Sequence, residues 1–188
     1  MSSRRISNQK VSPISLSNAK RWLRILDTDT SEDETVKEII LSALDYVETY
    51  LNKNVSLDVF LLSLSDFSDV TIDKLPFHSL VKIEYYNTDN ELTLLTAENY
   101  ELTQTTIEDA SIKFLTEIET YSREDGTKRS DTVKITYRAG YTFDNVPGSI
   151  KTAMQLLISK WFDNRTDERS DKQTAVERIL NPLRNVNV

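Results

Sequence analysis

The chain has 188 residues, no cysteine, one histidine, three isolated glycines and a formal net charge of −7. These counts exclude disulfides, thiolate metal sites, thiol nucleophiles, multi-histidine metal sites and the glycine-rich phosphate-binding loops of nucleotide enzymes. The length predicts one domain with a sizeable core, no apolar run approaches the roughly 20 residues of a membrane span, and the polar start does not resemble a signal peptide, so we expect a cytosolic protein at synthesis.

The first part of the chain is basic. Residues 1–26 hold six Lys or Arg and no acid, and residues 27–188 carry the balance, −13. We predict a flexible basic leader over residues 1–14, because chain termini are often loose. The cations are either solvated, or they form an arm that docks on an acidic partner or on phosphates. No aromatic residue lies between the leader cations, so the signal for nucleic-acid binding is weak.

Two helices are predicted next, over residues 17–26 and 31–52. The first begins at Ser17 as N-cap and places apolar residues on one face. In the second, Ser31 and Glu34 have the spacing of a capping box, acids fill the first turn, and apolar residues recur at helical spacing up to Leu51. The second helix is therefore predicted to be amphipathic.

From Val55 the apolar residues alternate with a period of two, which indicates strands. We expect seven short strands, at residues 59–64, 70–72, 81–86, 91–95, 100–103, 111–115 and 133–137. The sequence Leu75–Phe77 is predicted as a break, with His78 in the turn after it. The polar stretch Glu117–Asp131 is predicted to be an exposed loop or hairpin.

Helical spacing returns after Gly140, where the last strand is predicted to turn away in a positive-φ conformation. Helices are predicted at 147–162, with Pro147 at its start, and at 174–181. The expected fold class is α+β: a mainly α-helical core with an inserted block of short antiparallel strands. Within a single domain, residues 15–54 and 141–182 would form the helical core, 55–140 the β-rich insertion, and 183–188 a flexible tail.

A search for catalytic groups leaves few candidates. The 30 Asp and Glu residues allow a two-carboxylate glycosidase or a magnesium-dependent nuclease, but they gather at helix starts and in loops, which is typical of a solvated surface. No Lys has an acid two residues before it. His78 could act as a general base, yet a lone turn histidine is more often a surface residue. Trp161 falls on an apolar helical stripe and is predicted to be core, whereas Phe162 lies off it and is the better interface candidate.

Several strings in this order resemble a known family. They are Val11–Leu16, then Ala19–Lys20 and Leu23–Ile25; a long helix ending in Tyr46–Leu51; and Val133–Tyr141, followed by Val146–Pro147, Ile150–Lys151 and Trp161–Arg165. Together they resemble the head–tail connector proteins (adaptor or head-completion proteins) of long-tailed bacteriophages and related prophages. The resemblance covers both ends of the chain, about residues 11–54 and 133–184. The long Glu117–Asp131 loop and the basic leader depart from the family pattern.

The resemblance implies a virion structural protein without catalytic activity or cofactor. It implies a homo-oligomeric ring, a dodecamer in the virion, that lies below the portal protein and extends the channel for double-stranded DNA. A monomer in solution, which orders only on docking, stays open as an alternative. Tail or tail-completion proteins would dock on the far side. Opposite charges on one chain suit the two different patches of a head-to-tail ring, and an acidic wall lets DNA slide. The expected location is the head–tail interface, and the host cytoplasm during assembly.

We expect Thr166–Val188 to reach the portal or a neighbouring copy, because its few apolar residues cannot fold alone. The residues predicted to form interfaces are Arg21, Arg24, Phe162, Arg165, Ile179, Leu180, Leu183 and Arg184. Two other classes of function remain open at this point. They are another virion or tail-assembly interaction protein and, less favoured, a carboxylate enzyme or DNA-binding module.

Overall fold

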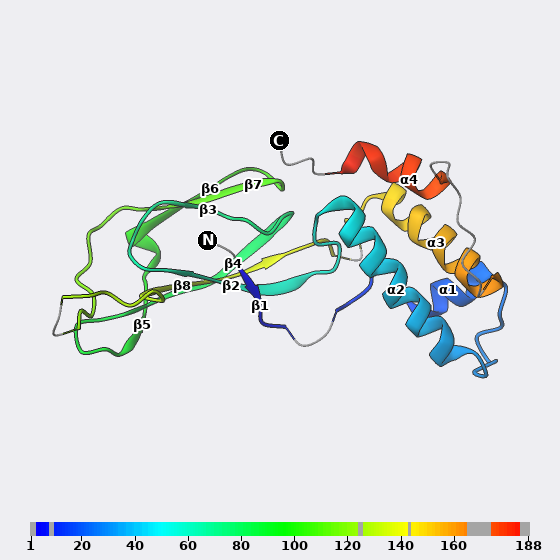
Figure 1. Cartoon of the computed structure of the whole chain (residues 1–188), viewed down its shortest axis with the longest axis horizontal. Coiled ribbons are helices and arrows are strands. Elements are labelled where there is room, and N and C mark those ends of the chain that lie inside the picture. The colour runs from blue at the N-terminus through cyan, green and yellow to red at the C-terminus, as the bar shows by residue number, and fades with distance from the viewer. Residues whose placement is uncertain (1–2, 8–9, 124–125, 143, 165–173, 185–188) are drawn as a thin grey trace. The chain divides into compact units, whose positions relative to one another are not determined.

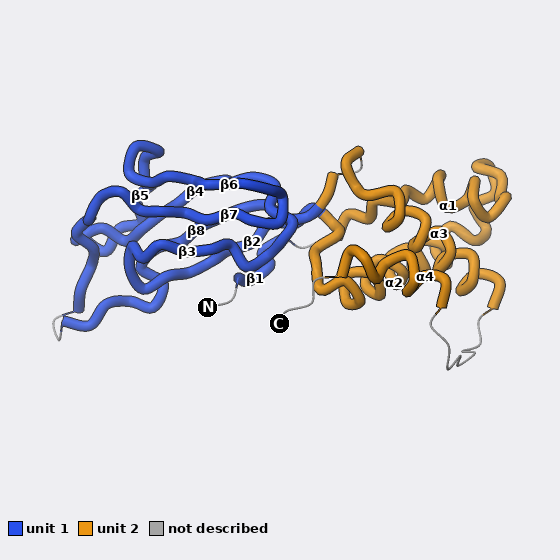
Figure 2. Tube along the Cα trace, turned by 90° about the horizontal axis from the view of Figure 1, so that it is seen from above, with its two compact units in different colours: residues 1–9, 57–140 blue, residues 10–56, 141–188 orange. Residues whose placement is uncertain are grey.

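The computed structural model describes residues 3–7, 10–123, 126–142, 144–164 and 174–184. The chain forms two compact units and passes between them three times (Figures 1 and 2). The helical unit comprises residues 10–56 and 141–188, and the β unit comprises residues 1–9 and 57–140. The predicted α+β class is confirmed, although strands form nearly as large a share of the chain as helices, so that "mainly helical" overstated the helical part.

The helical unit contains α1 (Leu16–Leu23), α2 (Asp33–Leu51), α3 (Gly148–Asp163) and α4 (Ala175–Leu180), followed by the 3-10 turn η2 (Asn181–Leu183). All four predicted helices are present among the described residues. They share one apolar core, to which α2 contributes Val36, Ile40, Ala43, Leu44, Val47 and Leu51. The period of 3.6 in the sequence identified this buried face because each buried residue lies one helical turn from the next.

Both predicted helix starts were wrong in detail. Ser15, not Ser17, is the N-cap of α1, and its hydroxyl accepts a hydrogen bond from the Asn18 N–H at 3.2 Å. Ser31 forms no capping box; its N–H and hydroxyl both donate to the Asp29 carboxylate instead. Ser31 therefore belongs to a tight turn between α1 and α2. Short polar side chains such as that of Asp29 bond backbone N–H groups in turns as readily as those at helix ends.

The β unit contains β1 (Arg4–Arg5), β2 (Asp58–Leu64), β3 (Val70–Thr71), β4 (Phe77–Tyr86), β5 (Leu92–Leu94), β6 (Tyr100–Thr106), β7 (Asp109–Phe114) and β8 (Val133–Ala139), with a 3-10 turn η1 (Ala97–Asn99). The strands form an antiparallel five-stranded sheet, in the order β1-β2-β8-β4-β5, and a three-stranded sheet, in the order β3-β7-β6. One apolar core contains residues of both sheets, including Phe60, Ile83 and Ile135 from the larger and Ile112 from the smaller.

Strand β4 begins four residues before its prediction, so His78 lies in a strand and not in a turn. Register shifts between Phe77 and Ser79 and between Leu80 and Lys82 break the alternation of buried and exposed residues that the sequence analysis relied on. Two other expectations were confirmed. Gly140 has φ of 119°, and the Glu117–Asp131 segment folds back on itself, with a bridge between Ser122 and Lys128.

The leader is not flexible over the residues that the structure describes at its start. Arg4 and Arg5 pair with Leu61 and Phe60 of β2. Ser3 is buried, and both its N–H and its hydroxyl donate to the Asp73 carboxylate. A two-residue strand leaves no periodic signal in the sequence, and its partners lie more than 50 residues away. Local composition could therefore not reveal this strand.

Candidate functional site: assembly surfaces

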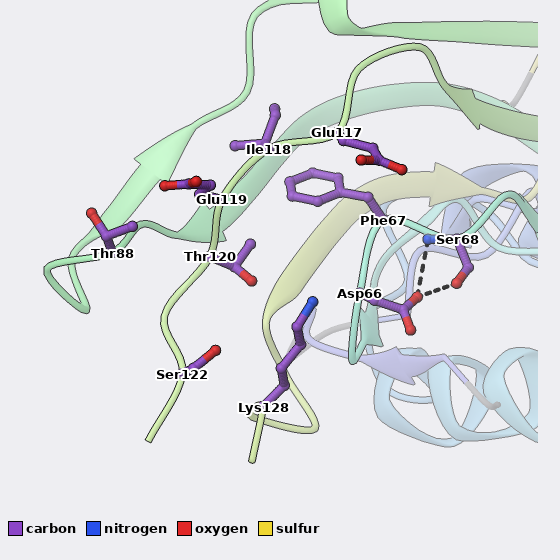
Figure 3. A pocket seen from close by; sticks show the side chains of 10 residues that line it. All are labelled: Asp66, Phe67, Ser68, Thr88, Glu117, Ile118, Glu119, Thr120, Ser122 and Lys128. Carbon is purple, nitrogen blue, oxygen red and sulfur yellow. Dashed lines mark hydrogen bonds between the residues drawn. The ribbon is translucent and has the colours of Figure 1, made fainter. Parts of the chain in front are cut away.

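A shallow groove of about 750 Å³ in the β unit is the first place to look for chemistry (Figure 3). It lies between the Glu117–Asp131 segment and the loop that carries Phe67, and Glu117, Glu119, Asp66 and Lys128 are among its lining residues. Over the described ranges, no three acidic or histidine side chains are placed to hold a metal ion.

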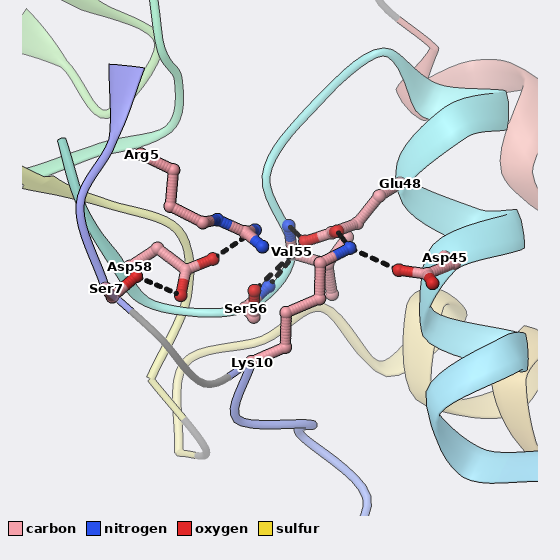
Figure 4. A network of polar contacts seen from close by, with 8 residues as sticks. All are labelled: Arg5, Ser7, Lys10, Asp45, Glu48, Val55, Ser56 and Asp58. Carbon is pink, nitrogen blue, oxygen red and sulfur yellow. Dashed lines mark hydrogen bonds and ion pairs between the residues drawn. The ribbon is translucent and has the colours of Figure 1, made fainter. Parts of the chain in front are cut away.

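The basic leader is partly neutralised within each unit (Figure 4). In the β unit, the Arg5 guanidinium forms an ion pair with Asp58, whose side chain is fully buried, and the Ser7 hydroxyl donates to the same carboxylate at 3.0 Å. In the helical unit, Lys10 pairs with Asp45 and, at 2.8 Å, with Glu48. The predicted arm of free charges is thus reduced by two.

Glu48 also fixes the turn after α2. One of its carboxylate oxygens accepts hydrogen bonds from the N–H groups of Val55 and Ser56, at 2.9 and 3.0 Å, and from the Ser56 hydroxyl at 3.1 Å (Figure 4). Its other oxygen receives Lys10. The network attaches the segment before α1 to the C-terminal end of α2, and therefore holds two parts of the helical unit together.

Lys20 is a structural cation as well. Its side chain is only 3% exposed and its ammonium donates to the carbonyl oxygens of Asp27 and Asp29, at 3.1 and 2.6 Å, and to the Asp33 carboxylate at 2.8 Å. All three acceptors belong to the turn between α1 and α2 or to the first turn of α2. Lys20 therefore locks the angle between these helices and is not available to a partner.

Arg21 and Arg24 remain exposed on α1 and at its C-cap. Beside them lie two exposed apolar side chains, Trp22 at 45% and Leu26 at 74%. The Trp22 indole N–H donates to the Ser159 hydroxyl of α3 at 2.7 Å, which orients the ring against the unit while leaving part of it exposed. We call Arg21, Trp22, Arg24 and Leu26 the α1 patch. Arg and Trp beside exposed apolar surface are typical of protein interfaces.

An acidic surface lies on α2. Glu34, Glu38, Leu41 and Asp45 are exposed at spacings of four, three and four residues, and therefore share one face, which we call the α2 face. Lys37 pairs with Glu34 and Lys10 pairs with Asp45. Between these pairs lie Glu38 and the exposed Leu41. The α2 face thus combines acidic side chains with an exposed apolar residue. It complements the α1 patch, which combines basic side chains with exposed apolar ones.

The other predicted interface residues divide into four groups. Phe162, Ile179 and Leu183 are half-buried against the helical core, and Arg184 is exposed with its guanidinium carbon 5.4 Å from the centre of the Tyr50 ring. Leu180 is fully buried in the core, so its prediction as an interface residue was wrong. Arg165 lies outside the described residues. Trp161 packs against the core as predicted, edge-on to Tyr46.

The described part of the C-terminal segment, residues 174–184, folds onto its own unit. Thr174 and Glu177 form a capping box at the start of α4. The Tyr50 hydroxyl donates to the side chain of Asn181 and, at 3.4 Å, to the Glu177 carbonyl. The apolar residues of α4 could not fold alone, but the grooves of α2 and α3 bury them.

One buried network in the β unit perturbs two titratable groups. The Tyr137 hydroxyl donates to Ser3 Oγ at 2.8 Å and lies 3.0 Å from Asp73 Oδ1. Burial raises the pKa of the Tyr137 phenol, and the Asp73 charge adds to this effect. Burial also acts to raise the pKa of Asp73, but hydrogen bonds from Ser3 and Tyr137 outweigh burial and hold the Asp73 pKa below its ordinary value. The network fastens the start of the chain to β8.

Comparison with known proteins identifies this arrangement. The family model described as head completion protein matches residues 13–175. The chain belongs to the head completion protein family. Membership confirms the predicted class of function, a structural head–tail connector of the virion. No curated protein matches the chain.

Solved structures with the same fold include a chain of the "neck of empty GTA particle computed with C6 symmetry", with a TM-score of 0.74 and 17% identity over 100% of this chain and 97% of that one. A chain of the "virion of native gene transfer agent (GTA) particle" gives 0.73 at the same identity and coverage. A chain of the "neck of native GTA particle computed with C12 symmetry" gives 0.64 at 17% identity over 96% of each chain. In addition, no helix within the described ranges is long and apolar enough to cross a membrane.

Proposed function

We propose that this head completion protein assembles as a ring of identical copies at the head–tail interface of a virion. The ring lies below the portal protein, extends the channel through which double-stranded DNA passes, and presents a docking surface for tail or tail-completion proteins. The observation that carries the proposal is that the α1 patch is basic and apolar whereas the α2 face is acidic and apolar. A cyclic ring needs two different, complementary surfaces of this kind on each copy. The protein has no catalytic role in this assembly.

The similar folds give the proposal independent support. Chains of this fold occur in particle necks computed with C6 and C12 symmetry, and twelvefold symmetry corresponds to the dodecamer that the family resemblance implies. The acidic balance of the chain after residue 26 also suits a DNA channel, since clustered cations would hold the phosphates of the passing duplex.

Electron microscopy of the purified protein with portal-bearing heads tests the proposal. A connector caps the portal coaxially as a ring, whereas another tail-assembly protein would not bind the portal alone. The absence of any coaxial density, at protein concentrations that complete heads in an extract, would refute the ring.

A charge reversal tests the contact between copies. We expect Arg21→Glu combined with Arg24→Glu to lower ring occupancy at least tenfold, and Glu38→Lys on the same chain to restore part of it. Lys113→Glu, which makes the same kind of charge change on an exposed residue of β7, serves as the control. Assembly should also weaken as salt rises, because exposed charges are screened. Full occupancy in the double reversal would refute the α1–α2 contact but not the ring.

A further inference from the structure

The five-stranded sheet ends in β5, and one side of this strand has no strand beside it in the described structure. The Leu95 N–H donates to the Ile83 carbonyl at 2.8 Å, and the Glu91 carbonyl accepts from the Asn87 N–H at 3.0 Å. Since backbone groups alternate in direction along a strand, residues 91, 93 and 95 bond to β4 and the N–H and C=O groups of Leu92 and Leu94 point to the open edge.

The side chains of this edge are apolar. Leu92 is 46% and Leu94 is 61% exposed, and both lie on the sheet face opposite the core, because they pair with Tyr86 and Glu84 rather than with inward-facing residues. Natural edge strands are usually protected by a Lys, a Pro or a bulge. The three residues of β5 include none of these protections. An open, apolar edge of this kind is a template for another strand.

The opposite edge of the same sheet is β1. The Ile6 N–H donates to the Val59 carbonyl at 2.9 Å, so Arg4 and Ile6 bond to β2 and the backbone groups of Arg5 point outward. The side chains of Arg4 and Ile6 are exposed on the face away from the core. The β1 edge is thus basic with one apolar residue.

We infer that β5 of one copy pairs in parallel with β1 of the next copy around the ring. In a parallel pair, an outward-bonding residue lies opposite one that bonds to its own sheet. Leu94 would therefore lie opposite Ile6, and Leu92 opposite Arg4, with all four side chains on the face away from the core. An antiparallel pair would instead place Leu94 opposite Arg5, on the wrong face.

Charge favours the same partner. The turn before β5 carries exposed Asp89 and Glu91, and β1 brings the exposed Arg4 to it. Because the two edges differ, each copy that accepts a strand on one side still offers its other edge, as ring closure requires. The pairing is short, so it adds to the contact between helical units and does not replace it. This inference rests on the proposed ring, which it extends by a second contact between copies.

The absence of native cysteine makes the test direct. The full chain carrying Ile6→Cys and Leu94→Cys is assembled on portal-bearing heads and treated with a short bis-maleimide. We expect covalent multimers in a ladder that includes species larger than dimers. Ile6→Cys with Leu115→Cys is the matched control, because Leu115 is similarly exposed at 55% but lies outside the β5 edge. The control should show at most background cross-linking.

A second variant interrupts the edge itself. Leu94→Pro removes an N–H that points away from β4, so the thermal midpoint of the free protein should stay unchanged while assembly requires at least tenfold more protein. Rings that form by electron microscopy without a cross-linked ladder would overturn the strand pairing and leave the proposed function intact. Wild-type protein that never caps the portal would instead overturn the proposed function. A ladder equal in the two double-cysteine variants would also count against the pairing.

Discussion

Leu180 is the residue at which the sequence prediction and the structure differ most clearly, because it was predicted to form an interface and is buried in the core. Its side chain is fully buried against the helical core, although α4 spans only six residues. Replacing a buried Leu with Ala costs about 2–5 kcal/mol, from lost transfer energy and from the cavity that remains. Because a short terminal helix can move to close part of the cavity, we expect about 2–3 kcal/mol for Leu180→Ala.

Urea unfolding of the free chain, followed by tryptophan fluorescence, measures this cost. Both tryptophans, Trp22 and Trp161, lie in the helical unit, so their emission reports the unit that contains Leu180. With a urea dependence of about 1.5 kcal/mol per molar, the midpoint should fall by roughly 1.3–2 M. Half-buried Ile179 provides the control, and Ile179→Ala should shift the midpoint by less than half as much. An unchanged midpoint in Leu180→Ala, together with lost head completion, would show that Leu180 contacts a partner and that its burial here is wrong.

Two further predictions concern the buried polar groups. Lys20→Met should lower the unfolding free energy of the helical unit by about 2–3 kcal/mol, because it leaves the partly buried Asp33 carboxylate and two turn carbonyls without their donor. Lys37→Met removes an exposed pair and should shift the same urea titration far less. In the β unit, the depressed pKa of Asp73 contributes stability at pH values above its unfolded pKa, and this contribution is lost as the pH falls through the folded value. Tyr137→Phe removes one hydrogen bond to Asp73, so it should raise the Asp73 pKa and reduce this dependence of stability on acid. It should also cost about 1–2 kcal/mol of stability at neutral pH. Circular dichroism melts of the wild type and of Tyr137→Phe between pH 2 and 7 measure both effects, and a parallel loss of stability in the two proteins would contradict the network.

The deletion of residues 170–188 has a different expected result in light of the structure. The sequence suggests that the monomer should remain folded without this segment. In the structure, Val176 and Leu180 complete the helical core, so the truncated chain should expose apolar surface and melt at a lower temperature. A test of partner docking by this segment therefore needs point changes on its exposed side, such as Arg184→Glu, in place of truncation.

Periodicity alone was sufficient for the four helices and for most strands. The apolar spacing in α2 and α3 is regular over several turns, and a spacing of that kind is compatible with one buried face only. Counting residues also excluded whole classes of chemistry, because a chain without cysteine and with a single histidine lacks the atoms that those sites require. The family, too, could be identified from strings that lie in the helices and around Gly140.

The tertiary structure decided which charges and apolar residues are free. Lys20 and Arg21 are neighbours in a basic sequence, yet one is buried under three acceptors and the other faces solvent. Their fates depend on contacts with residues that lie 7 to 13 positions away, which composition cannot show. The same holds for β1, whose two residues acquire a sheet only through β2, and for Leu180, whose burial requires α2 and α3. The net charge of the leader was a property of the sequence. The α1 patch and the β1 and β5 edges exist only because segments far apart in the sequence fold together.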